Sequence, residues 1–164
     1  MRVALGSDHA GITLKNELKR AFDTETSDGA SLHTCIDVGT HTEESVDYPD
    51  FALQVAKGVA INTYDRGILV CGSGIGMSIA ANKVAGVRAA LIHDVDSARL
   101  CREHNDANVL ALAGRTLDTD TALSIVKVFL ETSFEGGRHQ RRVDRITCLL
   151  YTSDAADEGL GVDL

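Results

Sequence analysis

The sequence has no tryptophan, a single proline and only 4% aromatic residues, so its core must be built from aliphatic side chains and alanine. No apolar run approaches the roughly 20 residues that a membrane-spanning helix needs. The opening apolar segment is too short for a signal peptide. The four cysteines lack CxxC spacing, which argues against a zinc site and against a disulfide scaffold. We therefore expect a cytoplasmic, metal-free protein in a reducing compartment.

An excess of basic charge is also missing. The chain carries 24 acidic and 16 basic residues, a net charge of −8. A general nucleic-acid binder needs a basic face, so we expect no nucleic-acid partner. The charge still permits a small anionic ligand held by a few arginines. With 164 residues, 44% of them hydrophobic, the chain suits one globular domain.

Short apolar segments alternate with amphipathic segments along the chain. The pattern predicts strands at residues 3–5, 35–38, 68–71, 87–92 and 109–113, and helices at 12–22, 51–61, 77–84, 95–103 and 119–132. One more helix could form over residues 138–150. Strands that alternate with helices predict an α/β fold, a doubly wound, five-stranded parallel sheet with helices on both faces.

Two stretches lack this periodicity. Residues 23–33 are polar and predict a surface loop. Residues 152–164 are acidic and rich in small residues, which predicts a disordered tail. We therefore place one domain at residues 1–148 and treat residues 149–164 as a C-terminal tail with no assigned role.

Cys71 is the most informative candidate residue. It ends an apolar run and is followed at once by Gly72-Ser73-Gly74-Ile75-Gly76. A strand, a glycine turn and a helix start place this thiol at the carboxyl tip of a strand, where open α/β sheets bind ligands. Backbone amides at the helix start favour an anion and the thiolate form of a cysteine. The plainer alternative is a small buried cysteine in a core strand, but the adjacent glycines favour function.

The same glycine loop has a weaker interpretation as a nucleotide site. A dinucleotide fingerprint requires GxGxxG after the first strand, whereas Met77 occupies the last place of this motif. Asp94 does lie at about the right distance for an acid that binds ribose. No Gly-Lys-Ser/Thr sequence follows the loop, so it is not a phosphate-binding Walker A motif.

Three further polar groups lie at the end of a predicted strand or beside one. Asp8-His9 follows the first strand, His104-Asn105-Asp106 precedes the fifth, and Arg138-His139 with Arg141 and Arg142 opens the last helix. Arg138 and Arg142 are four residues apart, so on a helix they share a face and could clamp a phosphate. Each group also has a plainer explanation: a helix cap, a helix-end turn or a solvated basic face.

Taken together, these segments resemble the ribose-5-phosphate isomerase B family, within the wider group that includes the galactose-6-phosphate isomerase subunits. The matching segments occur in family order at residues 6–11, 47–49, 67–76, 78–83, 102–109 and 135–139. The resemblance covers residues 1–148. It implies a Rossmann-like fold, interconversion of ribose 5-phosphate and ribulose 5-phosphate without metal or organic cofactor, and a homodimer or tetramer whose sites are shared between subunits.

The resemblance also implies a role for each candidate residue. Cys71 would be the base that moves a proton between C1 and C2, since the nearby position where some relatives place a glutamate holds Ile75. Ser73 would assist at the reacting oxygens, and Asp8 and His104 would open the sugar ring. The implied substrate-binding residues are His9, Tyr48, Gly72, Gly74, Gly76, Asn105, Arg115, Arg138 and Arg142.

The physical logic agrees with that assignment. Proton abstraction beside a carbonyl creates an enediolate, and the amides of Gly72, Gly74 and Gly76 could stabilise its charge. Glycine lets the backbone approach a ligand closely. Two alternatives stay open: an isomerase of a six-carbon phosphate such as allose or galactose 6-phosphate, and a non-enzymatic module that binds a sugar phosphate or nucleotide.

Overall fold

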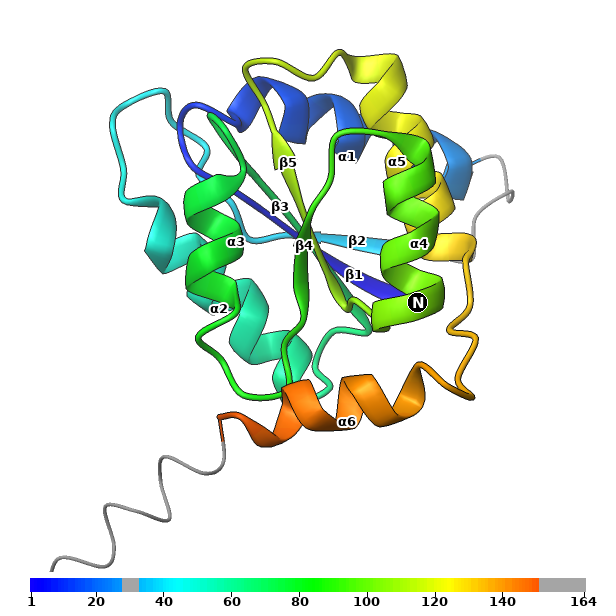
Figure 1. Cartoon of the computed structure of the whole chain (residues 1–164). Coiled ribbons are helices and arrows are strands. Elements are labelled where there is room, and N and C mark those ends of the chain that lie inside the picture. Colours follow the sequence, from blue (N-terminus) through cyan, green and yellow to red (C-terminus); the bar gives the residue numbers. More distant parts are fainter. Residues whose placement is uncertain (28–32, 151–164) are drawn as a thin grey trace, which may run out of the picture.

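A computed structural model describes residues 1–27 and 33–150 (Figure 1). The strands of this part are β1 (Arg2–Ser7), β2 (Thr34–Asp37), β3 (Arg66–Cys71), β4 (Ala89–Leu91) and β5 (Val109–Ala113). The helices are α1 (Ile12–Ser27), α2 (Tyr48–Ala60), α3 (Ile75–Ala81), α4 (Val95–Asn105), α5 (Thr119–Glu131) and α6 (Gln140–Cys148). Within the same residues, no helix is long and apolar enough to cross a membrane.

The five strands form one parallel sheet in the order β2-β1-β3-β5-β4. Buried residues of α1, α4 and α5 share one core cluster with the sheet, and those of α2 and α3 share another. The two groups of helices therefore cover opposite faces, while α6 lies apart from both at the lower end of the view in Figure 1. This arrangement confirms the predicted doubly wound, Rossmann-like class.

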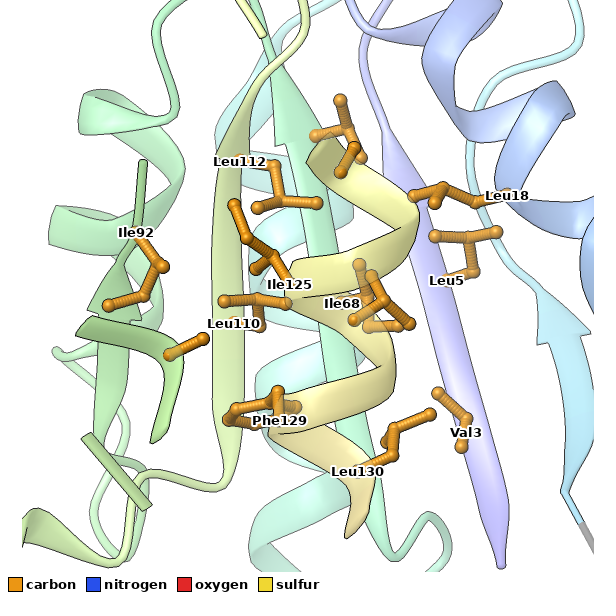
Figure 2. Close-up of a cluster of buried hydrophobic side chains, with 14 of the residues drawn as sticks. Val3, Leu5, Leu18, Ile68, Ile92, Leu110, Leu112, Ile125, Phe129 and Leu130 are labelled. Carbon is orange, nitrogen blue, oxygen red and sulfur yellow. The ribbon is translucent and has the colours of Figure 1, made fainter. Parts of the chain in front are cut away.

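The sheet separates the two clusters because side chains alternate along each strand. In β3, Ile68 and Val70 join the cluster under α5, and Leu69 and Cys71 join the cluster under α2 and α3. Figure 2 shows the first cluster, with α5 lying across the side chains of β1, β3 and β5. Burying each such aliphatic side chain contributes about 1.5–3 kcal/mol to stability. Packing on both faces of the sheet therefore fixes the position of the strand ends, where the site lies.

The prediction of a loop at residues 23–33 is wrong for residues 23–27, because α1 continues to Ser27. Local polar interactions support the extra turns: Lys19 pairs with Asp23 at 2.7 Å, and the Thr24 hydroxyl donates to the Arg20 carbonyl. The rest of that predicted loop, residues 28–32, lies outside the described residues. Helix α2 also starts earlier than predicted, since the only proline fits its first turn.

The carboxyl end of the domain follows the prediction more closely. Helix α6 occupies most of the expected residues 138–150, and its buried Val143 packs against the domain. The predicted disordered tail falls almost wholly on residues 151–164, which lie outside the described residues.

Candidate active site

A cleft of about 540 Å³ opens at the edge of the sheet where the strands end. Its lining comes from the segments that follow β1, β3, β5 and β4, which are neighbours in the sheet. The lining residues are Asp8, His9, Ala10, Tyr48, Cys71, Gly72, Ser73, Ile75, Gly76, His93, Ala113, Arg115 and Thr116. This volume suits a small metabolite. The structure thus gathers eight of the thirteen candidate residues in one place.

Cys71 is the last residue of β3 and lines the cleft although only 4% of it is exposed. Its sulfur accepts a hydrogen bond from the Gly74 amide at 3.2 Å. Gly74 has φ = +74°, and a Cβ there would overlap the Leu91 side chain. Glycine is therefore required to aim this amide at the sulfur, where it stabilises negative charge. Gly74 does not line the cleft. Its contribution to the site is the hydrogen bond that its amide donates to the Cys71 sulfur.

Half-buried Cys35 in β2 and buried Cys101 in α4 have a different environment. Burial raises the pKa of both Cys35 and Cys101 to about 11, so both are neutral thiols at physiological pH. They also lie outside the cleft, which makes them natural controls for the chemistry of Cys71.

The segment after β1 contributes a buried carboxylate and an imidazole. One oxygen of Asp8 accepts from the Gly11 amide at 2.9 Å, while the Asp8 amide donates to the Val70 carbonyl of β3. Asp8 therefore has the capping contact that its position suggested and also faces the cleft. His9 Nδ1 accepts from the Val46 amide at 3.2 Å. In the neutral ring this places the proton on Nε2, which can donate to an anion.

Two glycines of the loop lie against neighbouring residues of the cleft. A Cβ on Gly76 would come within 2.6 Å of the Tyr48 ring, so glycine is needed there to leave room for the tyrosine. A Cβ on Gly72 would make only an ordinary contact with Arg115, at 3.4 Å. Gly72 instead holds Arg115 through the backbone, because the Arg115 amide donates to the Gly72 carbonyl.

Sequence reasoning missed two polar lining residues, His93 and Thr116. His93 comes two residues after the end of β4, a position equivalent to that of the polar residues after β1 and β3. The rule that found Asp8, that polar residues follow a parallel strand at the ligand edge, would have found His93 as well.

The structure places His104, Asn105, Arg138 and Arg142 elsewhere. Helix α4 returns antiparallel to the strands and ends just before β5 begins, so His104 and Asn105 lie at the amino edge of the sheet. Strand β5 has five residues, and at roughly 3.3 Å per residue it separates the two edges by about 15 Å. One chain does not bring these four residues to Cys71.

A second polar group forms at this amino edge. The rings of His104 and His139 stack with centroids 4.2 Å apart and 4° between their planes. His139 Nε2 accepts from Arg138 Nε at 3.1 Å and lies 3.6 Å from a Glu135 carboxylate oxygen. Burial is the main cause that lowers the pKa of His139. The charges of His104, Arg138 and Arg142 lower this pKa further, and only the Glu135 carboxylate raises it.

His104, Glu135 and His139 also bring potential metal-ligand atoms within 4.8 Å of one another. A metal ion must lie close to the plane of each imidazole that binds it, because the nitrogen lone pair lies in that plane. The planes of two stacked, parallel rings do not meet. In this arrangement the two histidines are therefore not a shared metal centre.

Comparisons with known proteins find similarity over most of the chain. Residues 3–146 match the family described as Ribose/Galactose Isomerase. Ribose-5-phosphate isomerase B of Escherichia coli (strain K12) is 45% identical over 148 residues, which are 90% of this chain and 95% of that protein.

Two solved structures are also similar. That of Clostridium thermocellum ribose-5-phosphate isomerase B has a TM-score of 0.85 and 48% identity, covering 93% of this chain and 99% of that one. The Mycoplasma genitalium ribose-5-phosphate isomerase B with bound ribulose-5-phosphate has a TM-score of 0.83 and 41% identity, covering 93% and 97%. The chain belongs to the ribose/galactose isomerase family.

Proposed function

We propose that this chain is a ribose-5-phosphate isomerase that interconverts the aldose and ketose phosphates without a cofactor. Its family and the relative with bound ribulose-5-phosphate support the substrate class. The observation that carries the proposal is the Cys71 sulfur at a small-molecule cleft, with a backbone amide 3.2 Å away that favours its anion.

In the proposed reaction, the Cys71 thiolate removes the proton from C2 of the open-chain aldose. The C2–H electrons form a C1–C2 double bond, and the carbonyl electrons move to O1. The Cys71 thiol then returns the proton to C1, while the hydroxyl proton passes from O2 to O1 and leaves the C2 ketone. Ser73, exposed beside Cys71 in the cleft, is placed to assist this oxygen-to-oxygen transfer. No atom is gained or lost.

The remaining roles require a second copy of the chain. The cleft itself offers His9 and Arg115 to the phosphate. We propose that the amino edge of a partner subunit supplies His104 and Asn105 to the sugar, and Arg138 and Arg142 to the phosphate. His104 and Asp8 would then exchange the protons that open the furanose ring.

An apolar surface beside the cleft supports such a partner. Ile75 and Ile79, one turn apart on α3, are 52% and 56% exposed. Large apolar side chains clustered at the rim of a site are typical of protein–protein contacts. A dimer in which each cleft faces the other subunit's amino edge would cover them.

The test is to incubate the purified protein with ribose 5-phosphate and to follow ketose formation. In D₂O, a proton carried by Cys71 exchanges in part with solvent, so we expect deuterium at C1 of the product. Parallel assays with allose 6-phosphate and galactose 6-phosphate separate five- from six-carbon specificity. Saturable binding of ribose 5-phosphate without conversion would contradict the proposal and indicate a non-enzymatic binding module.

A further inference from the structure

We propose that His139 is a positioning residue for His104, and that its ring face sets the orientation of the His104 imidazole. This inference rests on the proposed role of His104 in ring opening. It concerns His139, to which neither the sequence nor the proposed mechanism gave a function.

The backbone of His104 is fixed by the turn that follows it. Asp106 adopts a left-handed conformation with φ = +45° at the end of α4. Arg102 donates to one oxygen of its carboxylate at 2.8 Å and Arg88 to the other at 2.7 Å. Arg102 is 2% exposed and also donates to the Ala107 carbonyl. The turn is therefore held from two sides.

The ring of His104 is held differently. Within residues 1–27 and 33–150, this imidazole makes no hydrogen bond and no ion pair, and its ring contact is the parallel stack on His139. Stacked aromatic rings restrict each other's rotation while leaving the edge nitrogens accessible. A proton donor that must present an edge nitrogen to a ring oxygen benefits from this type of support.

His139 is itself rigid. It is 5% exposed, and its carbonyl accepts from the amides of Arg142 and Val143 at the start of α6. Its Nε2 accepts from Arg138 Nε, an interaction that requires a lone pair on that nitrogen and hence a neutral ring.

The surrounding charges keep the proton off His139. The groups that face it are Arg138 and Arg142 at the start of α6, His104 at the end of α4, and Glu135 on the segment before α6. Two charged imidazoles 4.2 Å apart would repel each other, so at most one ring of the stack carries an added proton. A neutral His139 ring therefore supports the His104 ring by stacking and places no like charge against it.

The experiment compares three variants of the full-length protein. H139F keeps a flat ring face without a titrating group, H139A removes the face, and V143A loosens the same helix while it keeps both histidines. Ribose 5-phosphate is assayed as the cyclic substrate and ribulose 5-phosphate as the open-chain substrate. We expect H139A to lower kcat for ribose 5-phosphate at least tenfold and for ribulose 5-phosphate less than threefold, with H139F and V143A both within threefold of wild type.

Nuclear magnetic resonance of the histidine rings gives a readout independent of activity. We expect the His104 ring protons to show the upfield shift of a stacked ring in the wild type and in H139F, and to lose it in H139A. Equal losses in H139F and H139A, a loss matched by V143A, or unchanged His104 resonances in H139A would each overturn the proposal. Absence of isomerase activity in the wild type would instead contradict the proposed function.

Discussion

In the proposed mechanism, the two edges of the sheet carry complementary halves of a site. At the carboxyl edge, Cys71, Asp8 and His9 are each tied to a backbone amide within their own loop or the next one. At the amino edge, His104 and Arg138 both contact the His139 ring, and Arg142 lies in the first turn of α6. The first edge has a cleft and the proposed thiol base, and the second has surface cations.

Under the proposed assignment of roles, neither edge alone is a complete active site. The cleft holds a proton-transfer group but few cations, whereas the amino edge has guanidinium groups and a stacked histidine pair. Since the edges of one sheet lie about 15 Å apart, a chain can join its halves only through another copy. The experiments below test each half separately.

The largest effect is expected from Cys71→Ala, which removes the base at the carboxyl edge. Loss of a general base lowers turnover by about 10²–10⁴-fold, and we expect the upper part of this range because the cleft offers no carboxylate beside the sulfur other than Asp8. Steady-state assays with ribose 5-phosphate give the value. The matched control is Cys35→Ala, a thiol outside the cleft. Normal turnover in Cys71→Ala would exclude the assigned base.

A smaller effect is expected from Gly74→Ala, which disturbs the amide that faces the sulfur. An alanine at φ = +74° costs about 1–2 kcal/mol of strain, and its Cβ would also meet Leu91. We predict a lower unfolding midpoint in urea and a roughly tenfold lower kcat. The control is Gly86→Ala, which has φ = +82° but an open Cβ position, so it carries the strain without the loop displacement. Equal kcat in both variants would contradict the role of Gly74.

The smallest effect on catalysis is expected from Asp118→Ala, because Asp118 follows β5 at the carboxyl edge but does not line the cleft. The Asp118 side chain caps α5 by accepting from the Thr121 amide at 2.9 Å. Loss of such a cap costs about 1 kcal/mol, so we predict a drop in Tm of a few degrees with unchanged kcat and KM. A tenfold fall in kcat would show that a loss of stability alone can lower activity. The kcat losses expected for Cys71→Ala and Gly74→Ala could then not be assigned to the chemistry of the site.

Much of the fold follows from periodicity. The continuous apolar runs around Ile68 and Val109 predict buried parallel strands, and the spacing of Leu14 and Leu18 predicts the buried face of α1. Lys15 lies next to that face, yet it is fully buried and pairs with Asp37 at 2.7 Å. Such a pair joins α1 to β2, a long-range contact that local periodicity does not encode.

The candidate site was predictable where chemistry follows a strand, as for Asp8 and Cys71. Strand position does not predict the residues of the amino edge as part of the site. His104 lies where α4 ends and β5 begins, at the edge opposite the cleft. The resemblance implied shared sites, but the stack of His104 on His139 depends on the path of the segment before α6, which contains two glycines with positive φ.

The most direct test of the shared site is complementation between two inactive variants. Cys71→Ala lacks the base and His104→Ala lacks the group at the other edge, so each alone should be nearly inactive. If every site combines the two edges of different chains, a mixed dimer holds one intact site and one site with both defects. Random mixing after unfolding and refolding together should restore about a quarter of wild-type activity. Activity that stays at the level of the separate variants, with mixed dimers demonstrated by mass spectrometry, would contradict the account.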